Sequence, residues 1–184
     1  MAILVEMGRP ADLPERLEKE QACYEWLDKL QICYQRADHT PRDTIEQCAE
    51  VEQALGAPIC KNLFLCNRQQ TAFYLLLLAG EKPFRTKDLS GQIGSARLSF
   101  AGPEPMERLL HITPGSVSVM GLIHDRENQV QLLIDRSVLE QSDFCCHPCI
   151  NTSTLKIKTA DLLEVFLPAV GHVPVFVDLP EEPV

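Results

Sequence analysis

The chain has 184 residues, a formal net charge of -9 at pH 7, and 45% hydrophobic and 23% charged residues. This length suits one domain with its own hydrophobic core, and the composition, close to the globular average, excludes a disordered or low-complexity chain. Because sequence-independent affinity for nucleic acids comes from Lys and Arg that neutralise phosphates, the acidic balance argues against a general polyanion binder, and we expect no DNA partner.

Nothing in the sequence indicates export or a membrane. The apolar run at the N-terminus, residues 2–5, is interrupted by Glu6 and is too short for the core of a signal peptide. No window approaches the roughly 18 apolar residues of a membrane span. We therefore expect a cytoplasmic protein whose eight cysteines stay reduced.

Helical periodicity marks the first part of the chain. The spacing of apolar residues predicts a helix over residues 14–31, followed by a short strand over 32–37. A second helix is predicted to begin after a cap at Asp43 or Thr44 and to stop at Gly56, with an apolar face made by Ile45, Cys48, Val51 and Leu55.

Strand patterns then alternate with short helices. Residues 61–67 and 71–78 are predicted to form a hairpin, and residues 117–125 and 129–135 a second one. Between them, residues 86–110 indicate two short helical segments around the Gly102-Pro103 break.

The C-terminal part predicts a strand, a helix and a last strand. Leu155 and Ile157 alternate with lysines, Thr159 is predicted to cap a helix that ends near Gly171, and residues 173–179 favour a strand. An order that mixes hairpins with helices favours an α+β fold, with a mixed, largely antiparallel sheet and flanking helices. We expect a single domain over residues 1–184, with its core at about 14–179 and flexible ends.

The segment CCHPC, residues 145–149, raises the question of a thiol or metal protein. A thioredoxin-like role for Cys146-x-x-Cys149 needs a strand-to-helix turn, whereas a strand pattern follows here. Cys145, Cys146, His147 and Cys149 are too close together to supply four tetrahedral zinc ligands, so no metal site is predicted. A thiol-redox or metal protein is kept as the third hypothesis.

Three other features each allow two interpretations. Lys61 opens an apolar strand on the same face as Leu63 and Leu65, either as an edge-strand lysine or as a positive charge in a cleft. The turn at residues 113–116 is either an ordinary turn or a nest of backbone N–H groups around Gly115. The densest basic cluster is either a solvated loop or a local basic patch, and consists of Lys82, Arg85 and Lys87.

Four segments in one order resemble the YbaK family of prolyl-tRNA synthetase-associated editing domains: CKNLFL, then ITPGSVS with GLIHD, then HPCINTSTLKI, then DLLEVFLPAVGH. The resemblance covers about residues 20–179 and is greatest to the freestanding members that hydrolyse Ala-tRNA(Pro). It implies an α+β fold whose pocket holds the aminoacyl ester of mischarged tRNA(Pro) and hydrolyses it in trans without a metal or cofactor. Prolyl-tRNA synthetase is implied as a further partner.

The resemblance also assigns residues. It implies that Lys61 anchors the terminal nucleotide or the ester oxygen and that backbone N–H groups near Gly115 stabilise the oxyanion. His147 is the third catalytic residue, and it positions the substrate together with Asn151. The substrate-binding residues that it implies are Ser116, Ser118, Asn151 and Thr152. The family's G-x-x-x-P loop has Val119 in place of its proline, which supports the alternative of a non-catalytic module that binds an amino acid or aminoacyl-tRNA.

Overall fold

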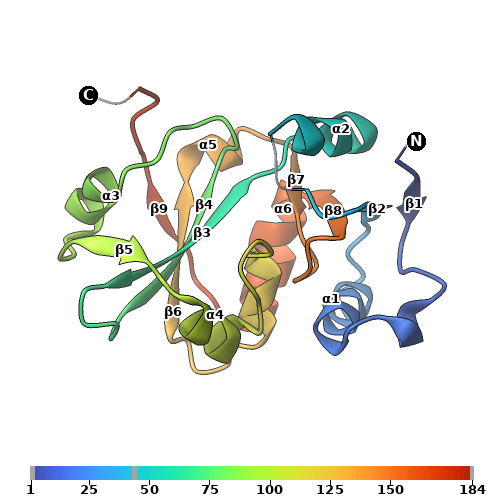
Figure 1. Cartoon of the computed structure of the whole chain (residues 1–184), viewed down its shortest axis with the longest axis horizontal. Coiled ribbons are helices and arrows are strands. Elements are labelled where there is room, and N and C mark those ends of the chain that lie inside the picture. The colour runs from blue at the N-terminus through green and yellow to red at the C-terminus, as the bar shows by residue number, and fades with distance from the viewer. Residues whose placement is uncertain (1–2, 43–44, 183–184) are drawn as a thin grey trace.

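Two β-sheets lie side by side along the long axis of the molecule (Figure 1). The structure, a computed structural model, describes residues 3–42 and 45–182. The first sheet is antiparallel, in the order β1 (Val5–Met7), β2 (Gln35–Asp38), β8 (Ser153–Lys158), β7 (Asp143–Cys146). The second is mixed, in the order β5 (Leu98–Phe100), β3 (Lys61–Asn67), β4 (Phe73–Leu78), β6 (Val130–Asp135), β9 (Val175–Val177).

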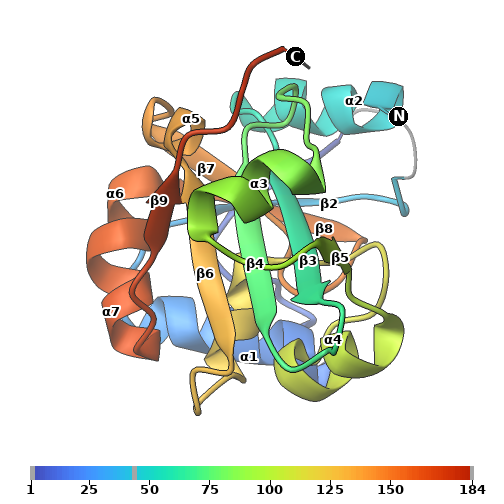
Figure 2. The same ribbon diagram turned by 90° about the vertical axis from the view of Figure 1, so that its left-hand side faces the viewer.

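Short helices cover these sheets. The α-helices are α1 (Glu18–Lys29), α2 (Ile45–Leu55), α3 (Thr86–Ile93), α4 (Pro103–Leu110), α5 (Arg136–Leu139), α6 (Thr159–Asp161) and α7 (Leu167–Val170). Residues 13–15 and 119–123 form 3₁₀ helices, η1 (Leu13–Glu15) and η2 (Val119–Ile123), and a π-helical stretch, η3 (Leu162–Phe166), joins α6 to α7. Helix α3 lies across one face of the five-stranded sheet (Figure 2). No helix in the described ranges is long and apolar enough to cross a membrane.

The main core fills the space between the two sheets. Its buried side chains include Phe64 and Leu75 from the mixed sheet and Phe144 and Leu155 from the antiparallel sheet. A second cluster, which contains Leu65, lies under α3 on the opposite face of the mixed sheet. Because side chains alternate along a strand, each face of β3 belongs to one of these clusters.

Most of the predicted elements are present. The α+β class is confirmed, and so are the hairpin of β3 and β4, the two helices within residues 86–110 and the strand over residues 153–158. The first helix begins at Glu18 rather than at residue 14, because Arg16 and Leu17 are extended and Pro14 belongs to η1. Gly56 and Gly171 have positive φ angles of 65° and 75°, as expected at helix ends. The cap predicted at Asp43 or Thr44 lies outside the described residues.

The second predicted hairpin is wrong. Residues 119–123 form η2, and β6 pairs in parallel with β4 and with β9. The Ser118 side chain accepts a hydrogen bond from Met120 N, and a Cβ at Gly121 would lie 2.6 Å from the side chain of Ile112. Because every residue of this turn is buried, its sequence is a continuous apolar run, and such a run has the same pattern as a buried strand.

Two further differences are local. Thr159 is not the cap: the N-cap is Lys158, and the Thr159 hydroxyl donates to the Gln141 carbonyl oxygen. The three strands β1, β5 and β7 were not predicted, because they are three or four residues long and carry too little alternation to be recognised.

Candidate active site

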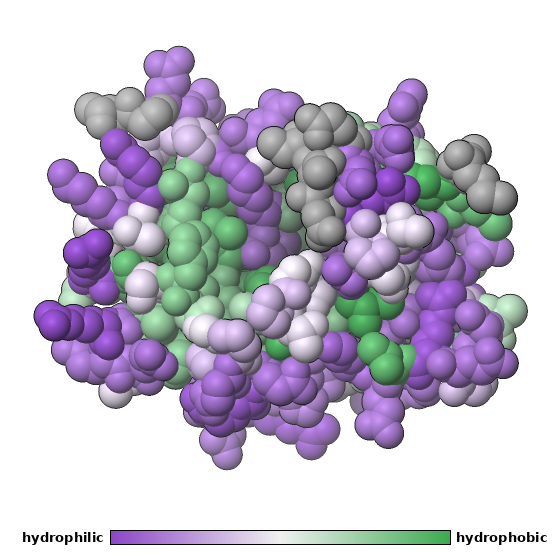
Figure 3. Space-filling view, viewed as in Figure 1, coloured by the Kyte–Doolittle hydropathy of each residue, from purple (hydrophilic) through white to green (hydrophobic). Residues whose placement is uncertain are grey.

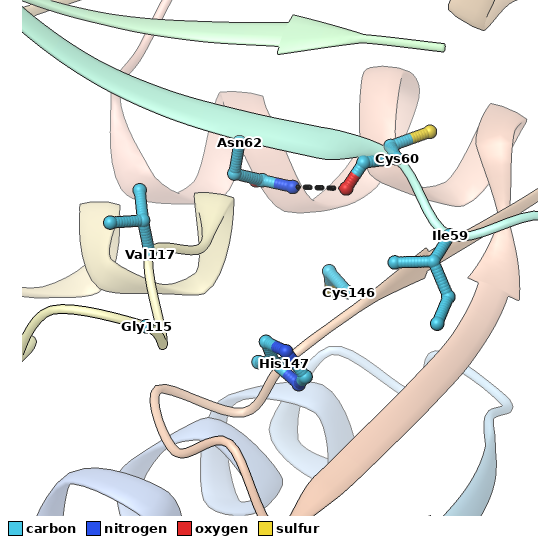
Figure 4. A pocket seen from close by; sticks show the side chains of 7 residues that line it. All are labelled: Ile59, Cys60, Asn62, Gly115, Val117, Cys146 and His147. Carbon is cyan, nitrogen blue, oxygen red and sulfur yellow. Dashed lines mark hydrogen bonds between the residues drawn. The ribbon is translucent and has the colours of Figure 1, made fainter. Parts of the chain in front are cut away.

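A pocket of about 250 Å³ lies where the two sheets meet. An isolated parallel bridge between Ile59 and Cys145 joins the start of β3 to β7 at this point. Three segments far apart in the sequence line the pocket, and the residues are Ile59, Cys60, Asn62, Gly115, Val117, Cys146 and His147. Figure 4 shows Asn62 and His147 on opposite sides of it, with the loop of Gly115 and Val117 along a third side.

The loop before η2 supplies backbone N–H groups. Gly115 has a φ of 91°, a left-handed conformation that favours glycine. Ser116 closes the turn, since its N–H and its hydroxyl both donate to the Thr113 carbonyl oxygen. Within the part of the chain that the structure describes, the N–H groups of Gly115 and Val117 donate no hydrogen bond. They are therefore available to a negatively charged oxygen in the pocket.

Ser118 fixes this loop against the end of β7. Its hydroxyl donates to the His147 carbonyl oxygen at 2.6 Å and accepts from Met120 N at 3.1 Å. The residue is fully buried. The hydroxyls of Ser116 and Ser118, which the resemblance assigns to substrate, are thus engaged within the protein, and they position the loop.

His147 has a defined tautomer. Its Nδ1 lies 2.8 Å from the Ser153 carbonyl oxygen, which can only accept, so Nδ1 carries the hydrogen and Nε2 carries the lone pair. Burial lowers the pKa of His147, and the nearby His39 lowers it further, while the hydrogen bond to Ser153 opposes the shift. The ring is therefore neutral at pH 7 and presents a hydrogen-bond acceptor.

His39 is a site residue that the sequence did not indicate. Its ring lies 6.3 Å from that of His147, centroid to centroid, and its Nε2 lies 2.8 Å from the Thr154 hydroxyl. Its backbone N–H donates to the Thr152 carbonyl oxygen, which ties β2 to the loop after β7. A lone histidine next to an irregular segment carries no periodic signal, so only the fold brings the two rings together.

Asn62 was also missed. Its Nδ2 donates to the Cys60 carbonyl oxygen at 3.0 Å, and its Oδ1 accepts from Val119 N at 2.9 Å. The amide therefore has a fixed orientation, and its second Nδ2 hydrogen is left for a ligand. The alternation along CKNLFL contains this signal, because a residue next to Lys61 must face the other side of the strand.

Lys61 does not line the pocket. It shares the face of Leu65, as its position in the strand predicted, and its Nζ donates to the Lys82 carbonyl oxygen at 2.7 Å. Lys82 itself is buried, and its Nζ lies 2.9 Å from Asp135 Oδ1. The basic cluster predicted at Lys82, Arg85 and Lys87 therefore loses one charge to a buried ion pair, and its interpretation as a solvated loop is wrong for Lys82.

The remaining predicted residues lie at the edge of the site. A Cβ on Gly115 would lie 3.8 Å from Asn151 Nδ2, so Asn151 borders the glycine turn. Thr152 is exposed and contributes its carbonyl oxygen to His39. Neither is among the described residues that line the pocket.

The cysteines of CCHPC belong to the packing. Burial raises the pKa of the Cys145 thiol to about 12 and that of Cys146 further still. Cys149 Sγ lies 3.5 Å from Cys23 Sγ, and both side chains are fully buried. Since the reactive form of cysteine is the thiolate, Cys146 is not an activated thiol. In the described ranges no three His, Cys, Asp or Glu side chains gather in a way that could hold a metal ion.

Comparisons with known proteins identify the family. Residues 39–165, more than half of the chain, match the aminoacyl-tRNA editing domain family. The chain is 30% identical over 149 residues to the prolyl-tRNA editing protein ProX of Acetoanaerobium sticklandii, covering 81% of this chain and 91% of that protein. It is 30% identical over 172 residues to the prolyl-tRNA synthetase associated domain-containing protein 1 of Danio rerio, covering 92% and 91%.

The same comparisons support the fold. A solved structure of a proposed trans-editing enzyme for prolyl tRNA synthetase superposes with a TM-score of 0.68 at 18% identity, covering 91% of this chain and 99% of that one. The chain belongs to the family of YbaK-like aminoacyl-tRNA editing domains. The resemblance found in the sequence is thereby confirmed.

Proposed function

We propose that this protein is a trans-editing aminoacyl-tRNA deacylase that hydrolyses mischarged tRNA(Pro), with Ala-tRNA(Pro) as its main substrate. One observation carries the proposal: a neutral His147, whose Nε2 makes no hydrogen bond within the described residues, lines the same small pocket as Gly115 and Val117, whose N–H groups are unpaired there. The names of the relatives, a prolyl-tRNA editing protein and a prolyl-tRNA synthetase associated domain protein, support it. The proposal includes action in the cytoplasm, beside prolyl-tRNA synthetase.

The reaction adds water across an ester. Water attacks the carbonyl carbon of the aminoacyl group, the bond from that carbon to the ribose oxygen breaks, and the ribose oxygen takes a proton. His147 Nε2 accepts a hydrogen bond from the attacking water, and the N–H groups of Gly115 and Val117 donate to the oxygen that becomes negative. Asn62 holds the substrate through its remaining amide hydrogen.

The proposal includes selection of the amino acid by size. A synthetase site built for proline cannot firmly reject alanine, because losing a few methylenes changes binding by only about 1 to 3 kcal/mol. A second site can exclude proline sterically, and the side chains of Ile59 and Val117 narrow this one.

The decisive experiment compares hydrolysis of Ala-tRNA(Pro) and Pro-tRNA(Pro), with a chelator present. We expect rapid loss of alanine only, and a loss of about 10²- to 10⁴-fold in rate for His147→Ala, the range for removing a general base. His111→Ala is the matched control, because His111 is exposed on the C-terminal cap of α4 and is not among the described residues that line the pocket.

Other outcomes would point elsewhere. Hydrolysis of both esters at equal rates would contradict the size argument. Failure to cleave Ala-, Ser- or Cys-tRNA(Pro) faster than buffer would contradict the deacylase and leave the non-catalytic binding module, for which Val119 in place of the family's proline is the supporting feature.

A further inference from the structure

An exposed aromatic surface lies beside the pocket. Phe100, on the edge strand β5, is 62% exposed. Its ring meets that of Phe84 edge to face, with centroids 6.1 Å apart and an interplanar angle of 71°. Phe84 and Leu63 are partly buried against the cluster under α3. We call these three residues the aromatic patch, and Figure 3 shows a continuous hydrophobic area over β3 and β5 on this side of the molecule.

The patch is continuous with the pocket along an open strand edge. Strand β5 pairs with β3 at Leu65–Asn67, and Ala101 N donates to the Phe64 carbonyl oxygen just beyond it, so no described strand pairs with the outer edge of Lys61–Leu63. Asn62 lines the pocket on one face of this edge, and Leu63 belongs to the patch on the other. From Asn62 to Leu65, which pairs with Phe100, three residues of strand span about 10 Å. A ligand that leaves the pocket over this edge therefore meets the patch within about three stacked bases, which are about 3.4 Å apart.

Three cations without an ion pair in the described ranges lie on, or next in sequence to, the segments that carry the patch, although the whole chain is acidic. Lys61 leaves β3 on the face of the patch and donates only to a neutral carbonyl oxygen. Lys61, Lys87 and Arg97 form no ion pair with any residue of the described ranges. Lys87 follows Phe84 by three positions, and Arg97 precedes β5 directly. Of the nearby carboxylates, Asp88 is paired with Arg85, whereas Glu81 is exposed.

We propose that Phe100 and Phe84 form a stacking platform for the unpaired bases at the 3′ end of the tRNA, next to the aminoacylated adenosine. This proposal rests on the proposed function, since the ester places that 3′ end at the pocket. Exposed aromatic rings flanked by Lys and Arg are the recurring means of holding single-stranded RNA, because every base has a face that stacks. The exposed Lys87 and Arg97, on the segments that carry the patch, favour an anionic partner over an apolar protein surface.

The first test compares two substrates that share the ester. Phe100→Ala should lower kcat/KM for Ala-tRNA(Pro) by about 5- to 150-fold, mainly through KM, in line with the loss of one stacked base. It should leave hydrolysis of 3′-O-alanyl-adenosine unchanged, because that compound has no neighbouring base. Phe176→Ala is the matched control, since Phe176 is 41% exposed on β9, the opposite edge strand of the same sheet. The platform would be overturned if Phe100→Ala and Phe176→Ala lowered kcat/KM for the tRNA equally. It would also be overturned if Phe100→Ala lowered kcat/KM equally for the tRNA and for 3′-O-alanyl-adenosine.

A second measurement does not depend on hydrolysis. Binding of the fluorescein-labelled RNA tetranucleotide ACCA should weaken by about the same factor in Phe100→Ala and not in Phe176→Ala. If no ester is cleaved but this pattern of binding is found, the proposed function fails and the platform stands. Absent or unchanged binding would overturn the platform even in an active deacylase. A concentration-dependent dimer abolished by Phe100→Ala would assign the patch to a second copy of the chain and would also overturn it.

Discussion

His147 can serve as an acceptor in the pocket only in its neutral form. Its Nδ1 hydrogen is committed to the Ser153 carbonyl oxygen, so protonation would place a second N–H on Nε2 and remove the lone pair. Burial and the neighbouring His39 lower the pKa of His147 below the ordinary value of 6.5, so the neutral form persists into mildly acidic solution. The tautomer is thus set by a backbone contact, and the protonation state is set by burial.

The pH dependence of the reaction follows from this shift. We predict that kcat/KM for Ala-tRNA(Pro), corrected for hydrolysis in buffer, stays level near neutrality and falls only below pH 6.5. The same shift lowers the free energy of unfolding in acid, because His147 binds a proton at a higher pH in the unfolded chain than in the folded protein. A pH–rate profile measures the effect, and His147→Ala should lose its acid limb. An acid limb centred above pH 6.5 would contradict the assignment of this residue.

At the scale of elements, the contact between β3 and η2 depends on one unusual residue. Val119 occupies the position where the family resemblance expects proline, and its N–H donates to Asn62 Oδ1 at 2.9 Å. A proline has no N–H, so this contact exists because of the replacement. The first position of a helical turn after a cap accepts proline without strain, and Ser118 is the N-cap of η2. The hydrogen bond can therefore be removed without rebuilding the backbone.

Val119→Pro tests what this contact does. We expect unfolding free energy to fall by about 1 kcal/mol, as for one ordinary hydrogen bond, partly offset by the stiffer unfolded chain. Because the Asn62 amide would keep only its hydrogen bond to the Cys60 carbonyl oxygen, it would be oriented less firmly, and KM for Ala-tRNA(Pro) should rise several-fold. Denaturation and steady-state kinetics measure both, and Val119→Ala, which keeps the N–H, is the control. Equal effects of the two substitutions would show that side-chain packing is what matters at this position.

The limits of sequence-based prediction are also visible in particular elements. The hairpin of β3 and β4 was predictable because two apolar runs of strand length are joined by a short polar link, and it is confirmed. Residues 117–125 were misjudged because a run buried on every side has no period, so a 3₁₀ turn and a strand look alike. The alternation correctly placed Lys61 on the face of Leu65, but only the contact between the sheets shows that the pocket lies on the other face, at Asn62. His39 and His147, 108 positions apart, meet solely through the pairing of β2 with β8.

At the scale of the molecule, a chain of net charge -9 must bind a polyanion through a small area. Long-range attraction is unfavourable for such a protein, so the contact must come from local cations and from stacking. The cations around the aromatic patch that form no ion pair within the described ranges are Lys61, Lys87 and Arg97. The predicted contact is therefore with a few phosphates near the 3′ end of the tRNA rather than with the whole acceptor stem.

The number of phosphates that the protein contacts can be measured from the salt dependence of the reaction. Each phosphate neutralised on a single strand contributes about -0.7 to the slope of log affinity against log salt, so three contacts predict a slope of about -2 for kcat/KM with Ala-tRNA(Pro). For 3′-O-alanyl-adenosine, which has no phosphate, the slope should be near zero. Lys87→Ala should make the slope for the tRNA less steep by one contact, whereas Lys158→Ala, on β8 of the other sheet, should not change it. A slope twice as steep would mean that a wider basic surface grips the tRNA, because a stacking platform with three cations cannot release so many counterions.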